Sequence, residues 1–104
     1  MIISEPIQEM GDLIGRKFRP KMVILFGSRA RGDSIPDSDV DFLVVMPFKG
    51  KRIKIEVKIL TLLNQFRGAY DVFVLTPEEF ERKKNIVGSI AYPASHEGQI
   101  LYAA

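Results

Sequence analysis

The sequence predicts an α/β fold of the α+β kind, in which a small mixed sheet of about four strands packs against helices. Three short apolar runs, at residues 22–26, 39–46 and 70–75, have the length and composition of strands. Segments with helical spacing precede the first run and separate the second from the third. Because 104 residues suffice for one core but not for two, we expect a single domain over residues 1–104.

The first expected element is a helix over residues 4–17, because Ser4 is a favourable N-cap. Its apolar residues fall on one face at helical spacing: Ile7, Met10, Ile14 and Phe18. Gly11 and Gly15 lower its helical propensity. The run MVILF, residues 22–26, follows as a central strand and ends at a glycine.

The second strand, residues 39–46, is followed by a helix over residues 51–66. We expect its inward face to comprise Ile53, Val57, Leu60 and Leu63. After the third strand, Thr76 and Glu79 predict a capping box that starts another helix. Residues 98–103 predict a fourth, edge strand, and His96 is expected in the loop before it.

The connections between these elements predict the strand directions. About ten residues join the first two strands, which is too short for a parallel crossover, so these strands are expected to be antiparallel. A helix joins the second and third strands, which favours a right-handed parallel crossover. These directions bring five residues from distant segments to one end of the sheet: Gly27, Ser28, Asp39, Asp41 and Asp71.

Asp39 and Asp41 are two residues apart, so their side chains are expected to point to the same face of the strand. A bound cation would relieve the repulsion among these carboxylates and Asp71. Carboxylate oxygens, without cysteine and with one histidine in the chain, favour Mg²⁺ or Mn²⁺ over zinc. Two alternatives stay open at this point: a turn formed by PDSD, residues 36–39, and a salt bridge from Arg29 or Arg31 to Asp41.

The segment GSRARGDS, residues 27–34, resembles a phosphate-binding P-loop only in part. Asp33 stands where that motif requires lysine, and Pro36 prevents the long helix that should follow. The segment still has features that suit phosphate binding. Gly27 allows close approach of a phosphate to the backbone, Ser28 supplies donors, and Arg29 and Arg31 supply positive charge, although a simple tight turn at Gly27 is an equal alternative.

Composition and charge narrow the classes of function that the protein could have. Residues 16–67 hold 12 Lys and Arg against 5 Asp and Glu, yet no recognised DNA-binding motif occurs, so direct binding of nucleic acid is not expected. Lys51, Arg52, Lys54 and Lys58 are interpreted as a solvated helix face. No apolar run is long enough to span a membrane, and residues 1–10 lack signal-peptide features, so a cytoplasmic location is expected.

The combined pattern resembles the minimal nucleotidyltransferase branch of the DNA polymerase beta superfamily. That family's Gly-Ser-x-Ala-Arg-Gly and Ser-Asp-x-Asp motifs are matched at Gly27, Ser28, Ala30, Arg31, Gly32, Ser38, Asp39 and Asp41. The ending EGQILY, residues 97–102, is also similar to the family's. The resemblance implies one minimal nucleotidyltransferase domain over residues 1–104.

The resemblance also implies the chemistry. Asp39, Asp41 and Asp71 would be catalytic and would bind two Mg²⁺ ions, with Asp71 helping to activate an incoming hydroxyl group. Gly27 and Ser28, assisted by Arg31 and less centrally by Arg29, would bind the phosphates of ATP, and pyrophosphate would leave.

The molecule that accepts AMP is inferred from the family alone. Members of the minimal branch act as antitoxins that transfer AMP from ATP to a tyrosine of a helical HEPN-type ribonuclease toxin encoded nearby, so a protein adenylyltransferase is expected. Two other functions stay open. The chain could neutralise a partner by contact alone, with the aspartates kept for nucleotide binding, or it could modify a small molecule or nucleic-acid end within a larger complex.

Overall fold

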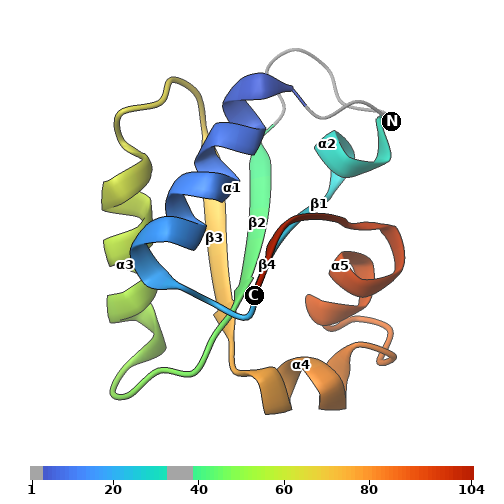
Figure 1. Ribbon diagram of the computed structural model, residues 1–104. Coiled ribbons are helices and arrows are strands. Elements are labelled where there is room, and N and C mark those ends of the chain that lie inside the picture. The colour runs from blue at the N-terminus through green and yellow to red at the C-terminus, as the bar shows by residue number, and fades with distance from the viewer. Residues whose placement is uncertain (1–3, 33–38) are drawn as a thin grey trace.

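A computed structural model describes residues 4–32 and 39–104 of the chain. Asp33, Pro36 and Ser38, which entered the sequence argument, lie outside these ranges. The described part is a four-stranded sheet with helices on both faces (Figure 1). None of its helices is both long and apolar enough to cross a membrane.

The strands lie in the order β3-β2-β1-β4, so β1 and β2 are central. Their bounds are β1 Met22–Phe26, β2 Val40–Val45, β3 Tyr70–Leu75 and β4 Gln99–Ala103. The predicted directions are confirmed: β1 is antiparallel to β2, and β2 is parallel to β3. The tail is also confirmed as an edge strand, which pairs antiparallel with β1.

Two helices cover one face of the sheet: α1 (Glu5–Phe18) and α3 (Arg52–Leu63). Two shorter helices cover the other face: α4 (Pro77–Lys83) and α5 (Ala91–Glu97) (Figure 1). The alternation along β2 divides the core between them. Phe42 and Val44 belong to the cluster under α1 and α3, whereas Leu43 and Val45 belong to the cluster under α4 and α5.

The caps predicted for α1 and α4 are confirmed. The Ser4 hydroxyl accepts a hydrogen bond from the Ile7 N–H. The Thr76 hydroxyl accepts one from the Glu79 N–H, and the Glu79 carboxylate accepts one from the Thr76 N–H. Each of these helices therefore starts with its first N–H groups partly satisfied.

The glycines of α1 have a packing role that the sequence argument missed. A Cβ on Gly11 would lie 2.6 Å from the Cβ of Leu101, and one on Gly15 would lie 2.3 Å from the ring of Tyr102. The lower helical propensity is thus offset by the close approach of β4 to α1. This contact fixes the edge strand against the helix.

The predicted inward face of α3 is wrong in its first half. Ile53 and Val57 are 60% and 50% exposed, whereas Ile59 and Leu63 are fully buried. The helix carries apolar residues on more than one side, so spacing alone did not fix which side meets the sheet. Partly buried Ile55 lies with Ile59 and Leu63 on the face of the helix that packs against the core.

The expected loop around His96 is also wrong, because this residue lies in α5. The helix has only seven residues and contains Pro93, which made it hard to predict. The proline is tolerated because it lies in the first turn. The rings of Tyr92 and His96 stack at a centroid distance of 4.2 Å.

Candidate functional site

Three strands bring the candidate residues to one end of the sheet, as the sequence predicted. Asp41 on β2 is the register partner of Phe26 at the end of β1 and of Asp71 on β3. Register partners on neighbouring strands point to the same face of a sheet and lie about 5 Å apart. The two carboxylates therefore emerge side by side, immediately beyond the end of β1 that carries Gly27.

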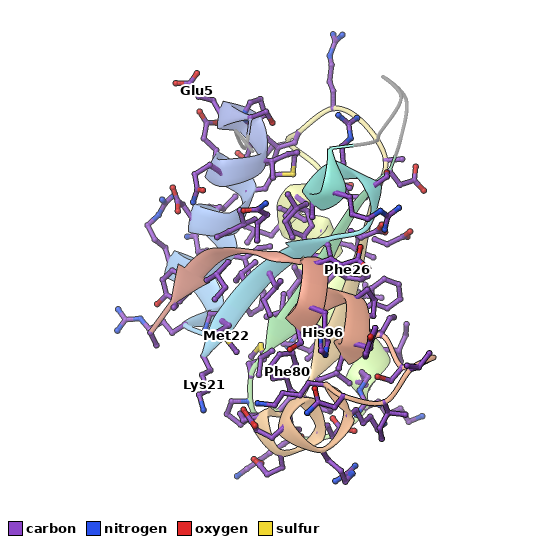
Figure 2. The ribbon with its side chains drawn as sticks, turned by 90° about the vertical axis from the view of Figure 1, so that its right-hand side faces the viewer. Glu5, Lys21, Met22, Phe26, Phe80 and His96 are labelled. Carbon is purple, nitrogen blue, oxygen red and sulfur yellow. The ribbon has the colours of Figure 1, made fainter. Side chains whose placement is uncertain are left out.

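The carboxylates emerge on the face that carries α4 and α5. Asp41 alternates with Leu43 and Val45, which belong to the core on that side. Phe26, the register partner of Asp41, and Phe73, two residues after Asp71, lie on this face with their ring centroids 5.9 Å apart and their planes tilted by 54°. Figure 2 labels Phe26 at this end of β1 and Met22 at the opposite end. The acidic group thus lies at the edge of an apolar, partly aromatic surface.

Asp41 is the most perturbed member of the acidic group. Its side chain is half-buried, whereas Asp39 and Asp71 are exposed. Burial raises the pKa of Asp41 above its ordinary value of 3.8, and the nearby charges of Asp71 and then Asp39 raise it further. The positive charge of Arg31 acts in the opposite direction. A carboxylate in this environment gains from any cation that binds next to it.

Gly27 lies directly against the Asp41 carboxylate. Its backbone has φ 78° and ψ −161°, a region that is essentially restricted to glycine. A Cβ at this position would lie 2.4 Å from Oδ2 of Asp41. The glycine is thus required twice: the backbone turn needs its freedom, and the carboxylate occupies the space of a side chain.

The short helix α2, Ser28–Arg31, begins immediately after Gly27. The carbonyl oxygen of Gly27 accepts hydrogen bonds from the N–H groups of Ala30 and Arg31, each at 3.1 Å. The first N–H groups of a helix have no acceptor within it, so the start of α2, which follows Gly27 beside the Asp41 carboxylate, can offer hydrogen-bond donors there. Ser28 and Arg29 are half-buried, and Arg31 is exposed.

Two contacts that were not predicted join α2 to α5 and β4. Nη1 of Arg31 lies 3.7 Å from Oε2 of Glu97, and both side chains are more than two-fifths exposed. The Gln99 side chain donates a hydrogen bond of 3.5 Å to the carbonyl oxygen of Ala30. Glu97 and Gln99 belong to the ending EGQILY, which was the available signal for their participation.

The start of β3, which carries Asp71, is anchored from two sides. The Tyr70 hydroxyl lies within hydrogen-bond distance of the carbonyl oxygens of Leu63, the last residue of α3, and of Phe66 in the turn that follows. The Val40 N–H donates to the carbonyl oxygen of Ala69 at 3.0 Å, which joins the starts of β2 and β3. These bonds hold the backbone of Asp71 in register with Asp41.

The donor set fits a hard divalent cation. Three carboxylates emerge at one end of the sheet, and carboxylate oxygens are the ligands that Mg²⁺ prefers. With their side chains as the structure has them, no three of the described His, Asp and Glu residues form a group that could hold a metal ion. A shared ion would therefore require other rotamers of these side chains, of which Asp39 and Asp71 are exposed while Asp41 and Asp71 share a register.

Comparison with known proteins identifies the family. The model of the nucleotidyltransferase domain family matches residues 7–98, which include every candidate residue at this end of the sheet. The chain belongs to this family. The resemblance inferred from the Gly-Ser and Asp-x-Asp motifs is therefore confirmed, and the chain is of the nucleotidyltransferase class of enzymes.

Two relatives from the archaeon Methanocaldococcus jannaschii carry names that propose a protein adenylyltransferase activity. One is 36% identical over 76 residues, which cover 71% of this chain and 76% of the relative. The other is 31% identical over 102 residues, which cover 95% of this chain and 97% of the relative. The second match shows that the likeness extends over nearly the full length of both chains.

Two solved structures share the fold. A proposed nucleotidyltransferase from Sulfolobus solfataricus aligns with a TM-score of 0.64 and 24% identity, covering 95% of this chain and 78% of that one. A chain from a toxin–antitoxin structure with AMP-PNP aligns with a TM-score of 0.56 and 17% identity, covering 97% and 75%. The predicted mixed α/β nucleotidyltransferase fold is thus confirmed.

Proposed function

We propose that the protein is a Mg²⁺-dependent nucleotidyltransferase that transfers AMP from ATP to a hydroxyl group of a partner protein, as an antitoxin acting on an HEPN-type toxin. The proposal treats residues 1–104 as one minimal nucleotidyltransferase domain. One observation carries it above the others: the glycine that starts α2 lies against a half-buried aspartate, which is in register with a second aspartate on the next strand.

We assign the phosphate-binding role to Gly27 and Ser28. Gly27 leaves no side chain between the backbone and the acidic group, and the N–H groups at the start of α2 suit phosphate oxygens. Arg31, and to a smaller extent Arg29, would add positive charge for the β- and γ-phosphates. The ion pair of Arg31 with Glu97 is exposed, so a triphosphate could compete for the guanidinium group.

We assign the metal-binding role to Asp39, Asp41 and Asp71. Bound Mg²⁺, with Mn²⁺ as a substitute and two ions as the family implies, would neutralise charge on the triphosphate and stabilise the attacking and leaving oxygens. Asp71 is exposed at the edge strand, where an acceptor can approach, and there it would accept the proton of the attacking hydroxyl group. The hydroxyl oxygen forms a bond to the α-phosphorus of ATP. The bond between the α-phosphorus and the oxygen that bridges it to the β-phosphorus breaks, and pyrophosphate leaves with that oxygen.

The choice of a protein as acceptor rests on the relatives. Both archaeal proteins carry names that propose transfer of AMP to proteins, and the likeness to one of them covers nearly the whole chain. Apolar side chains are also exposed near the edge strand β3, on α3 and in the turn before α5: Ile53, Val57, Ile86 and Val87. Such side chains are common where a partner docks.

Label transfer tests this function. The protein is incubated with Mg²⁺, ATP and the helical protein encoded next to it, with the label at the α-phosphate in one reaction and at the γ-phosphate in a parallel one. We expect the α-label alone to move to the partner. We expect the Asp39→Asn, Asp41→Asn variant to lose this transfer, whereas the Glu9→Gln, Glu78→Gln variant, with the same change of net charge at exposed positions, retains it.

Three outcomes would contradict the proposal in different ways. Transfer of the γ-label would indicate a kinase. Co-purification of the two proteins without transfer of either label would favour neutralisation by contact. Transfer of the α-label to a small molecule or a nucleic-acid end, but not to the partner, would keep the nucleotidyltransferase chemistry and reject the protein acceptor.

A further inference from the structure

A basic hollow lies at the end of the sheet opposite to the aspartates. Its volume is about 380 Å³, and it is lined by residues 46–51 together with Lys54, Ile55 and Lys58 of α3. In Figure 1 this is the region between the end of β2 and the start of α3. Because β2 runs from Asp41 away toward residue 46, the length of the strand separates the two sites.

Four lysine side chains surround this hollow: Lys49, Lys51, Lys54 and Lys58. No carboxylate is among its lining residues. None of the four lysines has an ion-pair partner among residues 4–32 and 39–104. Lys54 and Lys58 are one turn apart on α3, where like charges destabilise a helix. The cluster therefore has a net positive charge that the described part of the fold does not balance.

The start of α3 adds to this positive potential. Lys51 occupies the N-cap without a side-chain hydrogen bond, and the first turn holds no acidic residue. By contrast, α1 and α4 have capping side chains and acidic residues in their first turns. The first turn of the 12-residue helix α3, which borders the hollow, thus has no acidic residue of its own to offset its positive end.

The floor of the hollow is apolar. Met46, Phe48 and Ile55 are half-buried and pack against the core. The guanidinium carbon of Arg52 lies 5.3 Å from the centroid of the Phe48 ring, and both carboxylate oxygens of Glu79 accept hydrogen bonds from Arg52. Arg52 is therefore neutralised beside the hollow, whereas the four lysines are not. An aromatic and aliphatic floor with a cationic rim suits a ligand that has both an apolar part and a phosphate group.

We infer that this lysine hollow is a second binding site, which takes a nucleotide with its phosphate among the lysines and its base on the apolar floor. The same chemistry is offered by a free nucleotide and by a nucleotide within an RNA strand, and the test below separates them. The inference is independent of the transfer reaction, because none of its residues belongs to the acidic site. It adds a binding role to Lys51, Lys54 and Lys58, which are exposed as the interpretation of a solvated helix face requires.

The test is a titration of isotopically labelled protein, followed by amide chemical shifts, without Mg²⁺. The two probes are AMP and a hexauridylate RNA. We expect one of them to shift the amides of residues 46–58 in a saturable manner. The Lys54→Gln, Lys58→Gln variant should bind that probe at least about fivefold more weakly and with a smaller dependence on salt. The control variant Lys17→Gln, Arg82→Gln removes the same charge at exposed residues away from the hollow that form no ion pair within residues 4–32 and 39–104, and it should bind as the parent does.

Each outcome of the titration either supports or overturns the proposed second site. Saturable shifts at residues 46–58 with AMP identify a free nucleotide as the ligand. Shifts there with the RNA alone identify an RNA strand. Absence of saturable shifts there with both probes overturns the inference, and so does equal weakening in the two variants, which would show attraction by net charge only. Dispersed spectra of both variants establish that each of them is folded.

Discussion

Gly27→Ala tests the contact on which the site is built. The new Cβ would lie 2.4 Å from Oδ2 of Asp41, whereas ordinary contacts of a Cβ begin near 3.4 Å. The carboxylate must therefore move by about 1 Å, and a misplacement of this size lowers the rate of an enzyme by about 100-fold. The backbone at φ 78° and ψ −161° adds strain of about 1–3 kcal/mol.

The two consequences are measured separately. A loss of about 2 kcal/mol in the free energy of unfolding lowers the Tm by roughly 8–16 °C for a domain of this size. The assay for the rate is transfer of the α-label from ATP, carried out well below the lowered Tm. Gly88→Ala is the matched control, because Gly88 also has a positive φ of 96° but has no atom within 4 Å of the position of its Cβ. We expect this variant to lose stability and to keep its transfer rate.

A double-mutant cycle decides whether the carboxylate causes the loss. In the Asp41→Ala background, Gly27→Ala should cost only the backbone strain, so its effect on the Tm should be smaller than in the parent protein. Equal losses of Tm in both backgrounds, or a Gly27→Ala variant that transfers the label at the parent rate, would refute the reasoning.

Three further predictions concern single groups. Because burial and neighbouring charges raise the pKa of Asp41, the folded protein binds a proton there more tightly than the unfolded chain does, and ionised Asp41 destabilises the fold above pH 3.8. Without metal, Asp41→Asn should therefore raise the Tm near neutral pH and should lose this advantage as the pH falls through the raised pKa of Asp41 toward 3.8. Glu79→Ala removes both the capping box of α4 and the ion pair with Arg52, and calorimetry should show a loss of about 1–2 kcal/mol. Gly15→Ala should lower the Tm despite its better helical propensity, because the new Cβ meets Tyr102, and Tyr102→Ala should remove most of this effect.

Each of these three has a result that would count against it. A Tm advantage of Asp41→Asn that is the same at all pH values would exclude ionisation as the cause. Glu78→Ala, in the same first turn but exposed, should cost less than Glu79→Ala, and equal losses would show that neither the cap nor the ion pair matters. A gain in Tm for Gly15→Ala would show that α1 moves away from β4 at little cost.

Strand positions and directions could be predicted because they depend on local signals. The runs at residues 22–26 and 70–75 are β1 and β3 with the same bounds, and the length of each connection gave the direction of the next strand. The convergence of Gly27, Asp41 and Asp71 followed from those directions alone. This part of the candidate site could therefore be predicted from the positions of the strands and the lengths of their connections.

What could not be predicted depends on tertiary packing. The side of α3 that meets the sheet is chosen by the shape of the core, so Ile53 and Val57 were placed inward although they are exposed. The value of Gly15 became clear only with Tyr102 in place. The hollow that Lys49, Lys51, Lys54 and Lys58 surround could not be predicted either, because it forms only when the end of β2 packs beside α3.

The central claim is that nucleotide and metal bind where Gly27, Asp41 and Asp71 meet. The most direct measurement is a titration with Mn²⁺ and ATP, in which the paramagnetic ion broadens the amide signals of nearby residues. We predict the strongest broadening at Gly27, Ser28 and the starts of β2 and β3, and its loss in the Asp39→Asn, Asp41→Asn variant. Broadening that is centred elsewhere, or that persists unchanged in this variant, would contradict the account.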